Sequence, residues 1–169
     1  MLRFLILLCL LATCSCSIRS APRYTADPTD SDSVARELEK RRRASPSRLA
    51  RVVEGYLGVP YKWGGNTRAG MDCSAFVRTI FRQTYGIELP LTAKQIYRVG
   101  RTVNQRQDLK AGDLVFFRNT FSGQGVSHVG IYLGKKRFAH VGVSTGATIT
   151  SLDHPYFRVR YVGARRVER

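Results

Sequence analysis

The spacing of apolar side chains changes from a helical period early in the chain to a strand period later. The first helical stripe follows Ser45, which can cap a helix, and Pro46, which suits a first helical turn, and it stops at Gly58. This pattern predicts a first helix of about a dozen residues. The apolar residues of its stripe are Leu49, Val52, Val53, Tyr56 and Leu57.

Two more helices are expected before the strands begin. One starts at Cys73, runs to about Tyr85 and ends at Gly86, a residue type that favours the left-handed conformation of a helix end. A short one starts at Thr92, where T-A-K-Q matches a capping box. Both precede all of the predicted strands.

From Gly112 onward, apolar and polar residues follow the pattern of strands. Helices followed by strands indicate an α+β fold, with N-terminal helices packed on an antiparallel sheet of about five strands. We expect one domain over residues 46–169. The predicted strands are residues 113–118, 127–133, 137–143, 147–152 and 158–167.

Residues 1–15 have the layout of a secretory signal peptide, with Arg3, an apolar run and then small residues before a cysteine. The apolar run is about half of the ~20 residues that a membrane-spanning helix needs. The ending also resembles the lipobox of bacterial lipoproteins, in which a cysteine becomes the lipidated first residue of the mature protein. Cys16 is the preferred lipidation site and Cys14 the alternative, and an ordinary cleaved signal peptide is a third interpretation.

Residues 16–45 are rich in Ser, Pro, Asp and Arg and carry few large apolar side chains, so we expect a flexible tether. The chain has a net charge of +16, from 28 Lys+Arg against 12 Asp+Glu. In a cytosolic protein such a charge suggests binding to nucleic acid, but an exported protein does not meet that partner. Membrane headgroups or the cell-wall polymer are then the anionic candidates, and a generally basic, solvated surface is an equal alternative.

The chain is therefore expected to be an exported, lipid-anchored monomer. In envelopes with two membranes, an aspartate after the lipidated cysteine is the usual signal for retention in the inner membrane, and Ser17 stands there instead. This favours the outer membrane, with the domain facing the periplasm.

Cys73 is set apart from the other cysteines, Cys9, Cys14 and Cys16, which all lie near the N-terminus. Exported proteins normally pair their cysteines, so an odd one indicates an intermolecular link or a reactive thiol. At a helix start capped by Asp72, the helix dipole favours the thiolate, while the carboxylate opposes it. A reactive Cys73 therefore needs a cationic neighbour, for which a histidine is the expected residue.

The chain has three histidines, and two of them lie on successive predicted strands. His154, in D-H-P-Y, is expected in a surface turn. A three-residue loop over residues 134–136 would put His128 and His140 on one face within mutual reach, whereas a two-residue loop would put them on opposite faces. A zinc site with Cys73 is an alternative, but an exported thiol at a helix start favours nucleophilic catalysis without a metal.

Five motifs in order resemble those of the NlpC-type peptidoglycan endopeptidases, which are papain-like cysteine peptidases of bacterial cell walls. They are P-Y-K-W-G-G, D-C-S-A-F-V, L-K-A-G-D-L-V-F-F, S-H-V-G-I-Y-L-G and F-A-H-V, and the resemblance covers residues 47–166. It implies a papain-like fold and no metal or organic cofactor. Ala75 replaces the usual Gly after Cys-Ser, and Val141 replaces the usual Ala after the third catalytic position; both replacements are small or apolar.

The resemblance implies that Cys73 is the nucleophile, that His128 is the base that takes its proton, and that His140 orients His128. Tyr61 would help to bind the substrate and polarise the attacked carbonyl. Trp63 is instead expected to pack in the core. Asp72 and Ser74, beside the nucleophile, would line the substrate pocket.

The implied activity is hydrolysis of an amide bond in peptidoglycan stem peptides or cross-links, through an acyl-enzyme. The bond is either the one between D-Glu and the diamino acid or one across a D-Ala cross-link. Two alternatives are a wall-binding module that has lost activity and an acyltransferase on the same scaffold.

Overall fold

The computed structural model describes residue 36 and residues 47–120 and 125–168. By its contacts the chain forms two units, residues 1–43 and 44–169, and the second contains all the helices and strands described below. The expected signal peptide, the lipidation site at Cys16 and, apart from residue 36, the tether lie outside the described residues.

The first helix is shorter than expected and starts later. Helix α2 spans Arg48–Glu54, and the side chain of Ser47 caps it by accepting a hydrogen bond from the Ala50 amide, so the expectation of a cap at Ser45 was wrong. Beyond Glu54 the chain tightens into turns, where the Arg68 guanidinium donates to the Gly55 carbonyl at 2.6 Å. An arginine from a later segment thus takes a carbonyl that a longer helix would use itself.

The other two predicted helices are confirmed. Helix α3 spans Cys73–Tyr85, is capped by Asp72, and ends at Gly86, which has the positive φ of 72° that suits glycine. Helix α4, Ala93–Ile96, carries the full capping box between Thr92 and Gln95. Both starts were readable from the sequence because a capping side chain bonds to amides only three residues away.

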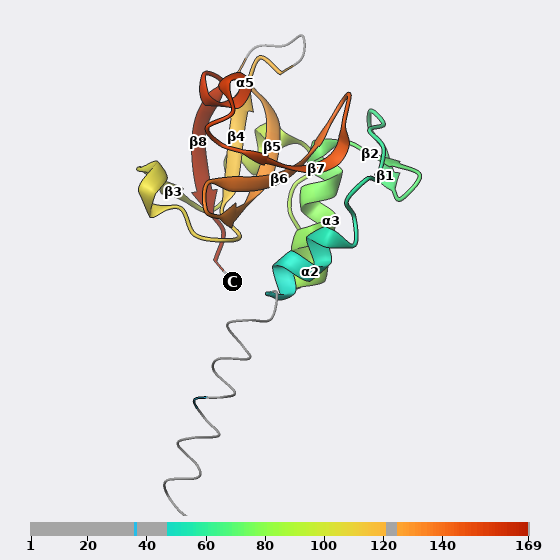
Figure 1. The fold of residues 1–169 in the computed structure, drawn as a ribbon, viewed down its shortest axis with the longest axis horizontal. Coiled ribbons are helices and arrows are strands. Elements are labelled where there is room, and N and C mark those ends of the chain that lie inside the picture. The colour runs from blue at the N-terminus through green and yellow to red at the C-terminus, as the bar shows by residue number, and fades with distance from the viewer. Residues whose placement is uncertain (1–35, 37–46, 121–124, 169) are drawn as a thin grey trace, which may run out of the picture. The chain divides into compact units, whose positions relative to one another are not determined.

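The strands form a six-stranded antiparallel sheet, which confirms the α+β class (Figure 1). Its order is β3-β8-β4-β5-β6-β7. The strands are β3 Arg101–Val103, β4 Leu114–Arg118, β5 Val126–Gly134, β6 Arg137–Gly142, β7 Gly146–Ser151 and β8 Tyr161–Arg166. The edge strand β3 was not predicted, because three residues are too few to show an alternating pattern.

Three short elements complete the domain. Strands β1 (Asn66–Thr67) and β2 (Gly70–Met71) form a small hairpin just before α3. The 3-10 helix η1 spans Arg106–Asp108. Helix α5, Pro155–Arg158, is capped by the His154 side chain, and the strand predicted over residues 158–167 begins only after it, as β8 at Tyr161.

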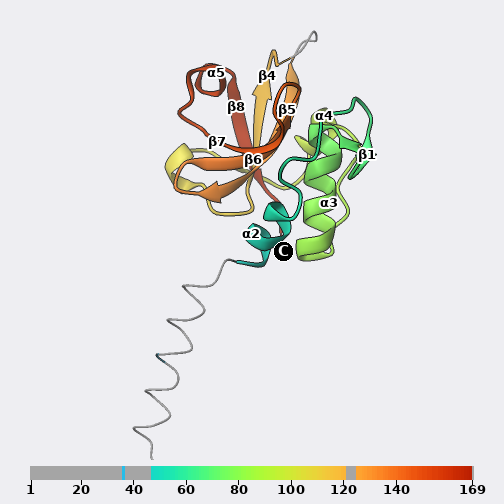
Figure 2. The ribbon, with the colours of Figure 1, turned by 45° about the vertical axis from the view of Figure 1, so that its right-hand side comes forward.

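Both faces of the sheet are buried. On one face, α3 packs on β5 and β6, α4 packs on β5, and α2 packs against α3 (Figures 1 and 2). On the other face, a second cluster centres on Phe117, Phe138 and Phe157 and includes α5. Strand β5 is buried on both sides. The His128 side chain lies on the second side, where it faces the aromatic cluster.

The turn between β5 and β6 has two residues, which is the alternative that by itself would put His128 and His140 on opposite faces. Gly134 pairs with Arg137, and Lys135 and Lys136 between them have positive φ values of 50° and 58°. Two successive residues with positive φ form the turn type that matches the twist of a hairpin.

A bulge in β5 cancels the consequence of this shorter turn. The pairing shifts by one residue at Leu133, and from there Tyr132 pairs with Phe138, as a three-residue loop would have produced. His128 and His140 therefore do share one face of the sheet. They lie within reach of each other, as a three-residue loop would have placed them, although the turn is the two-residue alternative.

A buried ion pair fixes the start of β4 against β8. Asp113 is fully buried and accepts two hydrogen bonds from the Arg166 guanidinium, at 2.7 and 2.6 Å. Asp113 also accepts from the Lys110 amide at 2.7 Å.

Within the described part of the chain, no helix is both long and apolar enough to span a bilayer.

Candidate active site

The loop before α3 is folded so that Tyr61 lies beside the helix start. Tyr61 forms an isolated bridge with Met71, and the Lys62 amide donates to the Met71 carbonyl at 3.0 Å. Gly64 has a positive φ of 66°, and a Cβ at Gly65 would lie only 2.5 Å from the Gly70 carbonyl oxygen. The two glycines therefore permit this close turn.

Asp72 and Ser74 organise the start of α3. Oδ1 of Asp72 accepts hydrogen bonds from the Ala75 amide and from the Ser74 hydroxyl, both at 2.8 Å. Both residues line the cavity that contains Cys73, as the resemblance implied. Their bonds hold Cys73 as the first residue of the helix.

Cys73 is a free thiol, partly exposed at the cavity surface. Burial raises its pKa from 9.0 to about 11; the Val129 amide opposes this, the Asp72 carboxylate adds to it, and the amides of Ser74 and Cys73 itself oppose it. The helix start therefore favours the thiolate, as expected, but burial outweighs it. At neutral pH the resting thiol keeps its proton.

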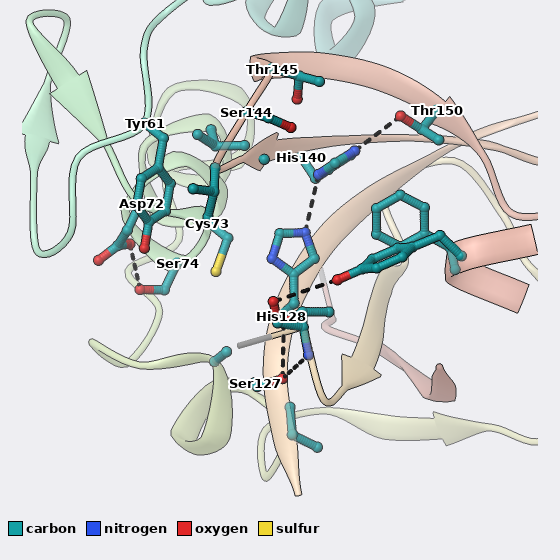
Figure 3. Close-up of a pocket in the computed structure, with 18 of the residues that line it drawn as sticks. Tyr61, Asp72, Cys73, Ser74, Ser127, His128, His140, Ser144, Thr145 and Thr150 are labelled. Atoms are coloured by element: carbon teal, nitrogen blue, oxygen red, sulfur yellow. Dashed lines mark hydrogen bonds between the residues drawn. The ribbon is translucent and has the colours of Figure 1, made fainter. Parts of the chain in front are cut away.

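A chain of hydrogen bonds leads away from this thiol across three strands. Nε2 of His128 lies 3.1 Å from Nδ1 of His140, and Nε2 of His140 lies 3.0 Å from Oγ1 of Thr150. Figure 3 shows the other ring nitrogen of His128 directed toward the sulfur of Cys73. His128 can thus take the thiol proton on one side while His140 holds its ring from the other.

Both imidazoles are enclosed by aromatic rings. The His140 ring stacks on Phe138 at 4.8 Å between centroids, and Phe157 contacts both histidines, at 6.1 Å from His128 and 4.9 Å from His140. Burial lowers the pKa of His128 from 6.5 to about 3, with a smaller effect from His140, and burial lowers the pKa of His140 to about 4. The expected cationic neighbour of Cys73 is therefore a neutral histidine in the resting site.

Tyr61 keeps its phenolic hydrogen. Its pKa is raised above 10.0, first by burial and then by the proximity of Cys73 and Asp72. A protonated phenol next to the sulfur is a hydrogen-bond donor, which is the property that a group polarising a carbonyl needs.

The thiol and the histidines open into one cavity of about 690 Å³. Trp63 lines it and is 70% exposed, so the expectation that this indole packs in the core was wrong. Val143, on the loop between β6 and β7, is 71% exposed and also lines the cavity. These exposed apolar side chains give the cavity mouth a surface suited to the uncharged parts of a ligand.

His154 is exposed in a turn, as predicted, but it also lines the cavity. No local feature of the sequence indicated this second property, because α5 reaches the cavity only through tertiary packing. Thr150 was missed for the same reason, since a threonine on a predicted strand carries no local signal of function.

Among residues 47–120 and 125–168, no group of three or more His, Cys, Asp or Glu side chains is arranged to hold a metal.

The comparisons with known proteins agree with this geometry. The model of the NlpC/P60 family matches residues 58–166. The probable endopeptidase NlpC homolog of Haemophilus influenzae is 42% identical over 119 residues, which are 70% of this chain and 61% of that protein. The murein DD-endopeptidase MepS/murein LD-carboxypeptidase of Escherichia coli K12 is 42% identical over 121 residues, 72% of this chain and 62% of that protein.

The chain thus spans about six tenths of the length of these two relatives. It is also 36% identical to the probable endopeptidase NlpC of Escherichia coli K12 over 163 residues, 96% of this chain and 97% of that one. A solved NlpC/P60 family protein from Bacillus cereus superposes with a TM-score of 0.64 at 33% identity, covering 72% of this chain and 40% of that one. These matches confirm the resemblance drawn from the five motifs, and the chain belongs to the NlpC/P60 family.

Proposed function

We propose that this chain is a cysteine endopeptidase that cleaves an amide bond in the stem peptides or cross-links of peptidoglycan. The observation that carries the proposal is the alignment of Cys73, His128 and His140 along one wall of an open cavity. Support comes from relatives named as murein endopeptidases, among them MepH of Escherichia coli K12, which is 37% identical over 150 residues.

The reaction starts with the transfer of the Cys73 thiol proton to Nδ1 of His128 as the sulfur attacks the scissile carbonyl carbon. The carbonyl oxygen becomes an oxyanion, which the Cys73 backbone amide and the Tyr61 hydroxyl stabilise. His128 then gives the proton to the leaving amine as the carbon–nitrogen bond breaks. Water attacks the thioester with His128 as base, releasing the acid and restoring the thiol.

Because the thiol and His128 are both neutral at rest, the proton moves only as the sulfur attacks. Burial disfavours the thiolate–imidazolium pair until a substrate carbonyl provides a site for the negative charge. His140 orients the ring of His128 for this transfer by accepting, at Nδ1, from the Nε2–H that neutral His128 carries when its Nδ1 is free to take the thiol proton.

The proposal is tested with purified peptidoglycan and the Cys73→Ala variant. Wild-type protein should release soluble muropeptides or stem peptides, and Cys73→Ala should release none while its Tm stays within a few degrees. Full hydrolysis by Cys73→Ala would overturn the assignment of the nucleophile. Binding without release by the wild type would favour the inactive wall-binding module, and acyl transfer to a lipid would favour the acyltransferase.

Mass spectrometry of the released fragments identifies the bond. The names of relatives point to different bonds, since MepS is a DD-endopeptidase and LD-carboxypeptidase and a Bacillus subtilis relative is a gamma-DL-glutamyl hydrolase. Cleavage between D-Glu and the diamino acid leaves a dipeptide on the sugar. Cleavage across a cross-link converts dimeric fragments to monomers of unchanged stem composition.

We further propose that the protein is lipid-anchored through Cys16 and works as a monomer on the periplasmic side of an outer membrane. The lipobox-like sequence supports this, as does a solved Staphylococcus aureus NLP/P60 protein described as similar to lipoprotein, with a TM-score of 0.65 at 33% identity. Cys16→Ala should move the protein from the membrane to the soluble fraction of cells. Release by Cys14→Ala instead would reassign the anchor, and retention of both variants would overturn it.

A further inference from the structure

The hydrogen-bond chain behind the thiol does not stop at His140. Oγ1 of Thr150, on β7, lies 3.0 Å from Nε2 of His140, on β6. In the register of these strands, His140 pairs directly with Thr148 and Phe138 pairs with Thr150. The ring of His140 therefore bonds diagonally to Thr150 and not to the threonine opposite it.

We infer that Thr150 is a positioning residue that stabilises the charged form of His128 by acting through His140. This inference rests on the proposed cysteine-peptidase function and extends the Cys73, His128 and His140 set by one member. Figure 3 shows the four side chains in sequence, from the sulfur to the Thr150 hydroxyl.

Thr150 matters because the hydrogens along this row of side chains are limited in where they can sit. When His128 holds the thiol proton, both of its ring nitrogens bear hydrogen, and its Nε2–H must donate to Nδ1 of His140. Neutral His140 then accepts at Nδ1 and carries its own hydrogen on Nε2. That N–H points at Thr150, whose oxygen is the acceptor.

The surroundings make this acceptor matter. His140 is only 3% exposed, with Phe138 stacked on its ring and Phe157 at its edge. Without the Thr150 hydroxyl, the Nε2–H of His140 would be buried without a hydrogen-bond acceptor. A buried N–H without an acceptor costs free energy, because it has lost its bond to water and gained none in the protein. The cost falls on the reacting arrangement, because the resting site can move its hydrogens to the other ring nitrogens, whereas proton transfer from Cys73 requires hydrogen on Nε2 of both histidines.

The test uses one isosteric change, one conservative change and one matched control. Thr150→Val removes the hydroxyl at nearly constant volume, Thr150→Ser keeps it, and Thr148→Val makes the same chemical change two residues away on the same strand. Alkylation of Cys73 by iodoacetamide at pH 8 reports proton removal from the thiol without any peptidoglycan. Stem-peptide hydrolysis reports kcat and KM separately.

For Thr150→Val we expect alkylation and kcat to fall roughly tenfold, the size of one hydrogen bond near a charge, with KM within about twofold of wild type. Thr150→Ser and Thr148→Val should behave like the wild type. All variants should alkylate equally when unfolded in urea and show similar Tm values, which separates a loss of proton transfer from a loss of folding.

If Thr150→Val is alkylated at the wild-type rate and has the wild-type kcat, the inference is overturned. It would also be overturned if Thr150→Ser or Thr148→Val lost as much as Thr150→Val, because packing of the strand would then explain the effect. If the wild-type protein fails to cut peptidoglycan while alkylation still follows the expected order, the proposed substrate is wrong and the role of Thr150 stands.

Discussion

His128 and His140 are joined by a 3.1 Å contact between ring nitrogens because β5 contains one extra residue, Leu133, just before its turn. The two-residue turn at Lys135 and Lys136 would by itself leave the histidines on opposite faces of the sheet. The bulge restores the register, and the turn tightens the hairpin. The geometry of the histidine pair thus depends on two local irregularities that compensate each other.

The turn residues make a stability prediction. Lys136 has a φ of 58°, which costs a residue with a Cβ about 1 kcal/mol relative to glycine. Lys136→Gly should therefore raise the free energy of unfolding by roughly that amount and leave hydrolysis unchanged, as measured by urea unfolding and a stem-peptide assay.

Lys136→Ala is the matched control for that change. Both variants lose the exposed ion pair of Lys136 with Asp153, but only glycine relieves the backbone. If alanine stabilises the protein as much as glycine does, the ammonium and not the backbone conformation is responsible.

The reactivity of Cys73 should increase with pH only well above neutrality. Burial raises the pKa of the thiol to about 11, and burial lowers the pKa of His128 to about 3, so neither group favours an ion pair at pH 7. The rate of alkylation by iodoacetamide should be nearly level from pH 5 to pH 8, where neutral His128 takes the thiol proton, and should rise toward pH 10, where hydroxide in solution removes it. A rate that rises in proportion to hydroxide from pH 5 onward would contradict proton removal by His128.

Acid should destabilise the domain through the same histidines. A histidine whose pKa is lowered on folding contributes stability above its unfolded pKa of 6.5, and this contribution is lost as the pH falls toward the folded value, about 3 for His128 and about 4 for His140. The free energy of unfolding, measured in urea at steps from pH 7 to pH 4, should therefore decrease. His128→Gln removes one of the two imidazoles and should make the decrease shallower; an unchanged slope would contradict the assignment to His128.

Trp63 should contribute to substrate binding and little to stability. It is the only tryptophan in the chain, so its fluorescence reports the cavity mouth directly. Acrylamide should quench this fluorescence in the folded protein, and stem peptides bound to Cys73→Ala should reduce the quenching. Trp63→Ala should raise KM with little change in Tm.

Phe157→Ala provides the contrast for that variant. Phe157 is 9% exposed and packs against Phe117, Phe138 and both histidines, so its removal should cost about 3–5 kcal/mol of stability. A loss of stability of similar size in Trp63→Ala would mean that the indole is structural after all.

The sequence by itself determined the features that depend on neighbouring residues. The caps at Asp72 and Thr92 and the end of α3 at Gly86 were readable because each is a contact or a φ value set within a few residues. The alternation after Gly112 located β4 to β7 to within a residue or two. Cys73 at a helix start followed from these local patterns.

The tertiary structure decided what depends on residues far apart in the chain. The hairpin alone permitted two relations between His128 and His140, and the bulge at Leu133 selected one. The link to Thr150 depends on how β7 pairs with β6, and the exposure of Trp63 depends on what covers its loop. Cys73 and His128 are neutral because both are buried. Burial results from the packing of distant segments, so it could not be predicted from any one stretch of the sequence.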